Sequence, residues 1–413
     1  MECEARKTAL MVMGKAIERR FNSDHSDKRE GGEFCGCGEI AEYAGRRKKQ
    51  FITVLGPMVL ERAWYHCEGC NAGFSPRDRE LGLLNDSLSP GVLRMVGISA
   101  AQSSFGEGSG LIKELGGVEV ESKQVERNAK ELGRDIALDE ERRVQRGECA
   151  AKTCYMGIDG TGVPMRSKET EGRSGKQADG SSRSREAKLV VVWTAEKRDS
   201  EGRPVRDPGS VSYNAAIETV KREDGDFSPF ARRVMRESER SGFGSAERQV
   251  VLGDGAAWIW NLCAELFPGA IEIVDIFHAK EHLCDVAKSL YGAGNDLCTQ
   301  WAKERMDELD RGELDKIIKA LRQHEHGHEK ARKCINYINN NRHRMNYPEF
   351  RRMGFCVSTG VVEGGCKSIV GNRLKRGGMH WTVPGANAII ALKAAIMSNR
   401  FDSWWKHRRR AAS

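Results

Sequence analysis

The spacing of hydrophobic positions changes repeatedly between residues 149 and 278, and this predicts alternating strands and helices. Short apolar runs with turn residues at their ends predict strands. The predicted strands are 155–159, 189–194, 211–216, 249–253 and 271–276. Helical spacing over 230–239 and 257–267 predicts helices, and the polar, Gly- and Ser-rich stretch 167–186 predicts a long loop. Three strands followed by alternating helix and strand indicate an α/β fold with one mixed sheet.

After this segment the strand-like pattern stops. Residues 279–350 carry Lys, Glu, Arg and Leu at helical spacing, which predicts an all-helical insertion. A further helix over 360–371 would carry Glu363 and, one turn later, Lys367 on the same face.

The N-terminal third has a different pattern. Residues 1–34 form a predicted helical segment, and two β-like runs over 50–55 and 58–65 are separated by Gly56 and Pro57. Four cysteines flank this hairpin. Cys35 and Cys37 precede it, and Cys67 and Cys70 follow it, which is typical of a zinc ribbon with four thiolate ligands over 35–80. The first pair is a tight Cys-x-Cys, so His66 or Cys3 could replace one ligand, and four incidental thiols remain the alternative.

Residues 81–148 return to helical spacing, with predicted helices over 90–102, 107–115 and 122–132. We interpret the glycines of 106–110 as a loop, Ser122 as an N-cap and Gly133 as the residue after the last helix. Helix, glycine turn and polar helix form a candidate helix-turn-helix, although any surface helical hairpin shows this pattern. The polar side chains that would enter the major groove are Lys123, Gln124, Arg127, Asn128 and Lys130.

Composition narrows the class of protein. The chain has 413 residues, long enough for two or three domains. It is 39% hydrophobic and 31% charged, and no apolar run approaches the ~20 residues of a membrane-spanning helix. The start of the chain does not resemble a secretory signal, and thirteen cysteines in so long a chain suit reduced thiols rather than a disulfide framework. We therefore expect a cytoplasmic protein with no membrane partner.

Charge is concentrated at one end of the chain. The net charge is +8, and residues 367–413 hold ten Lys or Arg against one Asp, a balance of +9, so the remainder is about neutral at −1. A basic segment beside tryptophans indicates binding of a polyanion such as nucleic acid. The alternative is a solvated basic tail, at least for residues 407–410.

Three acidic residues occupy special positions in this outline. Asp159 and Asp254 each end a predicted strand between glycines, which let a phosphodiester approach, and Glu363 lies on the predicted helix. Side chains at the carboxyl ends of parallel strands meet at one edge of a sheet. Carboxylates are ligands for Mg²⁺, and two ions ~3.5–4 Å apart can activate an attacking oxygen and stabilise a leaving one. A turn-forming Asp beside Gly is the alternative for Asp159 or Asp254 alone.

Other residues near these acids have plainer interpretations. Asp275 and His278 follow the last strand, where a capping or packing role outweighs a place beside the metals. Trp258 and Trp260 are predicted core residues, and Trp381 is predicted to pack in the core rather than stack on a base.

Four blocks carry a family resemblance. They are Gly157-Ile-Asp159-Gly-Thr-Gly-Val-Pro164, Leu252-Gly-Asp254-Gly-Ala-Ala-Trp258-Ile-Trp260, Asp275-Ile-Phe-His278-Ala-Lys-Glu-His-Leu283 and Thr359-Gly-Val-Val-Glu363-Gly-Gly-Cys-Lys367. Together they resemble the DDE transposases of bacterial insertion sequences. The continuation Val370-Gly-Asn-Arg373-Leu-Lys375-Arg376-Gly-Gly-Met379-His-Trp381 resembles the Kra-type branch in particular.

The resemblance implies a fold and an activity. It implies an RNase H-like core, in two parts over 149–278 and 351–413, that binds Mg²⁺ or Mn²⁺, as two ions, through Asp159, Asp254 and Glu363. The implied activity is cleavage of DNA at the element's ends and strand transfer into target DNA. We expect Lys367, Arg373, Lys375 and Arg376 to contact DNA phosphate, and a homodimer or larger synaptic oligomer at the bacterial nucleoid. The alternatives are another RNase H-like nuclease and a non-catalytic DNA-binding regulator.

Overall fold

The computed structural model describes residues 1–83, 87–143, 146–175, 177–222 and 225–412. The chain divides into two compact units. The first contains Met1–Ile136 and Asn399–Ser413, and the second contains Ala137–Ser398. No helix in the described part is both long and apolar enough to cross a membrane.

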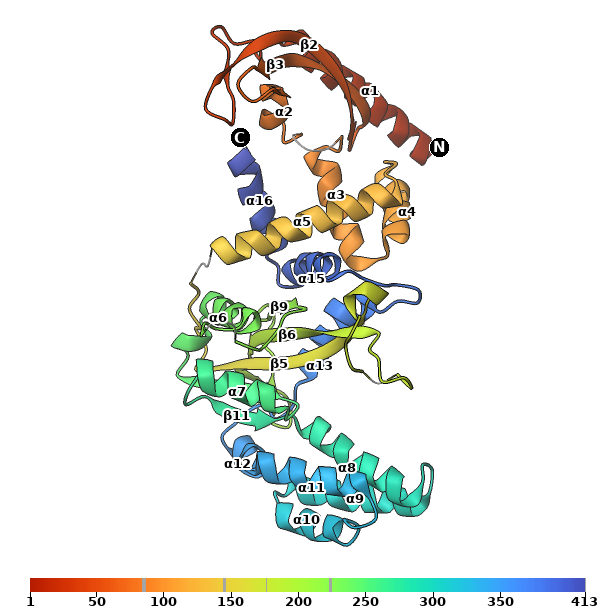
Figure 1. The fold of residues 1–413 in the computed structure, drawn as a ribbon, viewed down its shortest axis with the longest axis vertical. Helices are drawn as coiled ribbons and strands as arrows, with labels where there is room; N and C mark the ends of the chain where they lie inside the picture. The colour runs from red at the N-terminus through yellow and green to blue at the C-terminus, as the bar shows by residue number, and fades with distance from the viewer. Residues whose placement is uncertain (84–86, 144–145, 176, 223–224, 413) are drawn as a thin grey trace. The chain divides into compact units, whose positions relative to one another are not determined.

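The first unit begins with a helix and an antiparallel ribbon (Figure 1). Helix α1 (Glu2–Ser23) packs on the ribbon, whose strands β1 (Glu33–Phe34), β2 (Ile40–Thr53), β3 (Gly56–Cys67) and β4 (Ala72–Phe74) pair in chain order. The predicted hairpin is confirmed, with strands longer than expected. Gly56 takes a φ of 102°, which suits glycine at the turn. A buried ion pair of 2.6 Å between Arg62 and Asp78 joins β3 to α2 (Pro76–Glu80).

Three helices follow in the first unit: α3 (Pro90–Gln102), α4 (Phe105–Gly116) and α5 (Ser122–Arg142). Two expectations were wrong here. The glycines of 106–110 lie inside α4 and not in a loop, because Ser104 and Glu107 form a capping box that starts the helix earlier. Gly133 is buried within α5 and does not end it, because the apolar face continues to Ile136.

The C-terminal helix α16 (Phe401–Ala412) belongs to this first unit, although we had grouped it with the catalytic core. Asp402 forms an ion pair of 2.7 Å with Arg94 of α3. A Cβ on Gly97 would lie 3.2 Å from the ring of Phe401, so α16 packs closely on α3. The basic C-terminal segment is therefore divided between the two units.

The second unit is built on a mixed five-stranded sheet in the order β11-β10-β5-β6-β9, which confirms the mixed α/β architecture. Strands β5 (Thr153–Pro164), β10 (Arg248–Gly253) and β11 (Ile271–Val274) are parallel neighbours. Strands β6 (Ser184–Thr194) and β9 (Ser212–Ala216) extend the other side in antiparallel pairing. Strands β7 (Lys197–Arg198) and β8 (Pro204–Val205) form a small separate ribbon.

Helices cover the sheet. Helices α6 (Pro229–Ser241) and α15 (Val383–Met397) pack against β9, and α7 (Ala257–Leu266) connects β10 to β11. The segment before α15 comprises α13 (Gly360–Gly365), the π-helical turn η4 (Cys366–Gly371) and α14 (Asn372–Leu374). Short 3-10 turns are η1 (Ser167–Glu169), η2 (Phe243–Ser245) and η3 (Arg342–Arg344). The stacked rings of Tyr155 and Trp193, 5.5 Å apart, lie in the buried core.

The predicted all-helical insertion is confirmed. It follows β11 and precedes α13 along the chain (Figure 1). Its helices are α8 (Ile276–Tyr291), α9 (Asp296–Asp310), α10 (Leu314–Arg322), α11 (Glu329–Asn341) and α12 (Tyr347–Arg352). Helices α8 to α11 pack against one another as a bundle.

Candidate functional site

The two aspartates lie at equivalent positions on neighbouring parallel strands. Leu252 of β10 pairs with Gly157 of β5, so two residues further along, Asp254 stands beside Asp159. Asp254 follows the last residue of β10 as expected, whereas Asp159 lies inside β5, which continues to Pro164 because it pairs with β6 that far. Adjacent strands are about 4.8 Å apart, and residues in the same row point to the same face of a sheet. The fold therefore brings the two carboxylates into one row.

Helix α13 packs on the face of the sheet to which Asp159 points. A Cβ on Gly157 would lie 2.1 Å from Val362 of α13, and Gly157 and Asp159 share a face because side chains alternate along a strand. Gly365 likewise leaves no room for a Cβ, which would lie 2.7 Å from Tyr213. The two glycines let α13, which carries Glu363, approach the sheet at the row of aspartates.

The surroundings of the acids differ. Burial raises the pKa of Asp159, and the charge of Asp254 acts in the same direction. One oxygen of Asp159 accepts a hydrogen bond of 3.3 Å from the Cys366 thiol, while Glu363 is exposed. The described side chains that converge closely enough to hold one metal ion are four cysteines, and the three acids do not converge in that way. The fold thus places the acids on one face without closing a cage around an ion.

The loop after Asp254 rests on the helical insertion. Tyr337 of α11 donates a hydrogen bond of 2.9 Å to the backbone oxygen of Asp254. Gly255 has a φ of +98°, and a Cβ there would lie 2.5 Å from the Tyr337 ring. Asn341 donates to the backbone oxygen of Gly255 at 3.5 Å. The insertion therefore holds the backbone that presents Asp254.

We expect Gly255→Ala to disturb this loop more than the backbone strain alone would. The positive φ costs about 1–2 kcal/mol for a residue with a Cβ, and the contact with Tyr337 adds about 1–3 kcal/mol of overpacking. Thermal unfolding, together with the DNA cleavage that the family resemblance implies, measures the effect. Gly294→Ala is the matched control, because Gly294 has a φ of +81° and open space around it. Equal destabilisation by the two variants would show that the Tyr337 contact is unimportant.

Asp275 continues the row of aspartates and has a structural role. Ile271 pairs with Val250, so Asp275 stands beside Asp254 just beyond β11. One oxygen of its carboxylate accepts from the backbone N–H groups of Phe277 and His278 and caps α8. The other accepts from the backbone N–H of Thr359, at 2.7 Å, and from the Thr359 hydroxyl. Because Thr359 directly precedes α13, Asp275 ties the start of α8 to the helix of Glu363, in agreement with its interpretation as a cap.

Replacing Asp275 by Asn should lower stability by about 1–3 kcal/mol, because an amide nitrogen cannot accept the bonds from Thr359. We also expect cleavage to fall, even at temperatures where the variant is fully folded, because α13 is less firmly positioned. Asn295→Ala is a suitable control, since Asn295 caps α9 through a single bond to Leu297 and touches no part of the site. Full activity in folded Asp275→Asn would limit Asp275 to a stabilising role.

Two histidines lie on α8 beside this site. The rings of His278 and His282 are 5.1 Å apart, and His282 lies 4.1 Å from the ring of Tyr337. Burial, followed by the neighbouring His278, lowers the pKa of His282, so the neutral ring is favoured. A neutral histidine among aromatic rings here completes the packing that supports the Asp254 loop.

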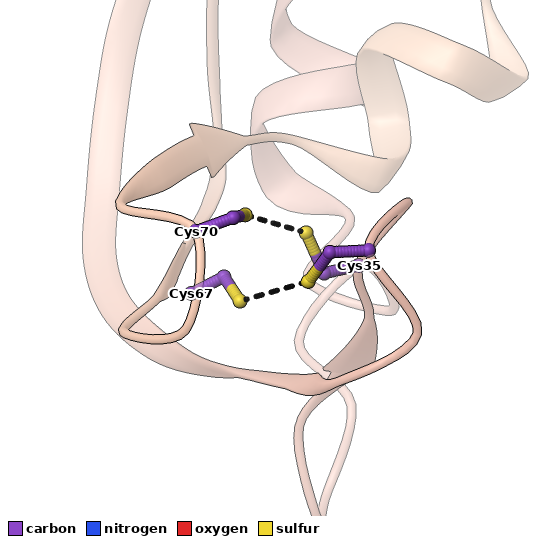
Figure 2. A group of neighbouring side chains, drawn as sticks. Cys35, Cys67 and Cys70 are labelled. Carbon is purple, nitrogen blue, oxygen red and sulfur yellow. Dashed lines mark hydrogen bonds between the residues drawn. The ribbon is translucent and has the colours of Figure 1, made fainter.

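The second chemical cluster is formed by the four cysteines of the ribbon. The sulfur atoms of Cys35, Cys37, Cys67 and Cys70 all lie within 4.8 Å of one another. The sulfur atoms of Cys35 and Cys70 are 3.4 Å apart, and those of Cys37 and Cys67 are 3.6 Å apart. Figure 2 shows Cys35, Cys67 and Cys70 pointing toward one another. The tight first pair therefore reaches the same point as the second. His66 is outside this group, and the side chain of Cys3 lies outside the described part.

Backbone N–H groups point at these sulfur atoms. The N–H of Cys37, together with the Cys70 thiol, lowers the pKa of Cys35 to about 7. The Cys35 thiol raises the pKa of Cys70 to about 12 against the effect of the Ala72 N–H. The four donors and their N–H partners fit a tetrahedral Zn²⁺ site.

The residues expected to contact DNA divide into exposed and buried. On α5, Lys123 and Arg127 are exposed and four residues apart, and Gln124 is half-buried. Asn128 is buried and donates to the backbone oxygen of Gln124 at 2.9 Å. Base contact by Asn128 was therefore a wrong expectation, because its side chain faces the interior of the helical region.

The C-terminal cations of the second unit divide in the same way. Lys367 and Lys375 are exposed, Arg376 is half-buried, and Lys375 donates to the Thr161 hydroxyl of β5 at 2.5 Å. Arg373 is only 1% exposed, and its guanidinium lies 5.3 Å from the centre of the Trp381 ring. Phosphate contact by Arg373 was thus also a wrong expectation, since the side chain packs against Trp381.

Three tryptophans were predicted to lie in the core, and two of them are buried. Trp260 and Trp381 are buried, and the Trp381 indole donates to the backbone oxygen of Leu374 at 2.9 Å. Trp258 is half-buried, with Phe230 on one side and the Lys188 ammonium 5.6 Å from its ring centre.

Comparison with known proteins identifies no family for this chain. No family model matches the chain, and no curated protein matches it. Among solved structures, the chain aligns with one described as the Drosophila P element transposase strand transfer complex, at 12% identity and a TM-score of 0.26, over 81% of this chain and 84% of that one. A similarity of this size does not establish a common fold.

Proposed function

We propose that the chain is a DDE transposase that cleaves DNA at the ends of an insertion sequence and joins them to target DNA. The observation that carries the proposal is the row formed by Asp159 and Asp254 on adjacent parallel strands, with the helix of Glu363 packed on the same face. The strand order supports an RNase H-like core, since three antiparallel strands, β5, β6 and β9, are extended at β5 by the two parallel strands.

The chemistry follows from the acids. When Mg²⁺ or Mn²⁺ is bound, it supplies a Lewis acid for the phosphodiester and lowers the pKa of an attacking water or 3′-hydroxyl. Asp159, Asp254 and Glu363 would hold the ions. Burial raises the pKa of Asp159, and a divalent ion bound beside the carboxylate would favour its charged form.

Transposition also requires DNA to be held and recognised. We assign sequence choice to Lys123, Gln124 and Arg127 of the first unit and phosphate contact to Lys367, Lys375 and Arg376 of the second. Base recognition needs donors at groove edges, whereas phosphate contact needs only charge. Synapsis of two DNA ends further implies a dimer or larger assembly.

We expect Arg127→Gln to narrow the difference in affinity between the element's end and random duplex by about 1–3 kcal/mol, because one base contact is lost. Lys367→Gln should instead weaken binding to both duplexes equally. Binding isotherms on the two DNAs, at one salt concentration, measure both effects. Equal loss on both duplexes for Arg127→Gln would contradict its role in base recognition.

The direct test is cleavage. Purified full-length protein is incubated with Mg²⁺ and duplexes that span the borders of its own genetic element, and the 3′ ends are mapped. Cuts at the borders followed by joining to a target plasmid support transposition. Cuts at junctions or free ends without joining would favour a nuclease, and specific binding without any cut would favour a regulator.

A further inference from the structure

A hollow lies on the connection between β5 and β6, apart from the three acids. Its volume is 1040 Å³, and it is formed by residues of the segment 165–183 together with His380. The sequence predicts a long loop over 167–186. The part of it that is described instead folds back on itself, with the Gly175 N–H donating to Gly180 at 2.8 Å and the Ser182 N–H donating to Arg173 at 3.1 Å.

The hollow is fixed to the core of the second unit. Met165 donates to the backbone oxygen of Arg183 at 3.0 Å, which closes the connection at its base. On the other side, the Arg166 N–H donates to Trp381 at 2.9 Å, and the Trp381 N–H donates to Pro164 at 3.1 Å. Because the side chain of Trp381 is buried, the wall of the hollow is anchored in the core.

The hollow is lined by more positive than negative charge. Four lining cations are exposed, and in the described part of the chain none of their side chains forms a hydrogen bond or ion pair: Arg166, Lys168, Arg173 and Arg183. The lining contains two acids, Glu171 and Asp179, which leaves a balance of +2. Asp179 already accepts hydrogen bonds from the backbone and hydroxyl of Ser181. Unpaired cations held together in one hollow favour an anionic ligand.

The other lining groups identify the kind of anion. Hydroxyls of serine and threonine, together with the backbone of two glycines, surround the cations, and these groups contact phosphate oxygens in nucleic-acid complexes. The lining contains no Phe, Tyr or Trp on which a base could stack. The chemistry suits the sugar-phosphate backbone rather than the bases.

We propose that this hollow binds the DNA backbone about six base pairs from the bond that is cut, an inference that rests on the proposed function. Met165 is six residues beyond Asp159 along an extended strand, roughly 20 Å at 3.3 Å per residue. Duplex DNA rises about 3.4 Å per base pair, so on a duplex that runs along β5, as this proposal requires, 20 Å corresponds to about six base pairs. The bound phosphates belong either to the element's end or to flanking or target DNA.

The test removes two cations from the hollow. Full-length Arg173→Gln/Arg183→Gln is compared with wild type for binding to a border duplex without divalent metal, across a salt series. We expect the slope of log affinity against log salt to shrink by about 0.9 for each lost phosphate contact, so by about 1.8. The matched control is Arg206→Gln/Lys303→Gln, which removes two exposed cations outside the hollow. A slope equal to that of the control would overturn the proposal.

Footprinting identifies the source of the phosphates. We expect protection of the DNA about six base pairs from the cut and loss of this protection in the double variant. A protected region inside the border would mean that the hollow binds the element's end. A protected region outside the border would mean that it binds flanking DNA. Protection of that region that persists in the double variant would overturn the proposal. DNA binding is measured without metal and so does not depend on cleavage. A wild-type protein that binds the duplex but never cleaves it would refute the transposase function and leave the proposal for the hollow standing. The salt slopes of the wild type and the double variant would still decide whether the hollow binds DNA.

Discussion

Replacing any one of the three acids by its amide, as Asp159→Asn, Asp254→Asn or Glu363→Gln, should lower cleavage at least about a thousandfold. Each amide keeps the shape of the side chain and loses the charge that holds a divalent ion, and several kcal/mol of transition-state stabilisation depend on that ion. The measurement is the rate of end cleavage in Mg²⁺. DNA binding without metal and thermal unfolding, measured in parallel, should stay close to wild type.

Exposed acids elsewhere provide the control for these three variants. Asp226→Asn and Glu201→Gln remove the same charge from surface ion pairs of the second unit and should leave cleavage unchanged. Near-normal cleavage by Asp159→Asn, Asp254→Asn or Glu363→Gln would exclude that residue from the site. Because Glu363 is the exposed member of the three, its variant is the most informative.

Removing zinc should unfold the ribbon of the first unit. We expect one Zn²⁺ per chain, and apparent zinc-binding free energies of about 10–16 kcal/mol are large enough to decide whether so small a module folds. Chelation, or Cys67→Ser, should therefore remove the hydrogen-exchange protection of β2 and β3. Elemental analysis of reductively purified protein gives the stoichiometry.

Another thiol tests whether the effect is specific. Cys149 lies outside the cluster, and its thiol donates to the backbone oxygen of Ala151, so Cys149→Ser should retain zinc and ribbon protection. Protein free of zinc with a fully protected ribbon would contradict the prediction.

Much of the second unit was predictable because its signals are local. Buried strands such as β10 are short apolar runs bounded by turn residues, and the helical insertion has a sustained helical period. The approximate position of Asp254 followed from the same pattern. The length of β5 could not be predicted from this pattern, because Asp159 is followed by glycines that resemble a turn. Only the pairing with β6 shows that the strand continues to Pro164.

The neighbours of the acids were not predictable, because they are contacts between distant segments. Cys366 is 207 residues from Asp159 and Tyr337 is 83 residues from Asp254, and neither belongs to a local pattern. Burial within a helix was missed for a similar reason. Asn128 and Arg373 are polar residues in polar surroundings, and their burial depends on the packing of α5 and of Trp381.

The membership of α16 in the first unit has a consequence for synthesis of the protein. Residues 137–398 are made between the two parts of that unit, and at about 5–20 residues per second they take roughly 13–50 s to translate. All three acids are therefore synthesised before Phe401, which packs on α3. A chain that stops after residue 398 would carry every acidic residue of the site and an incomplete first unit. Premature termination there would separate the capacity for chemistry from the unit to which we assign sequence choice.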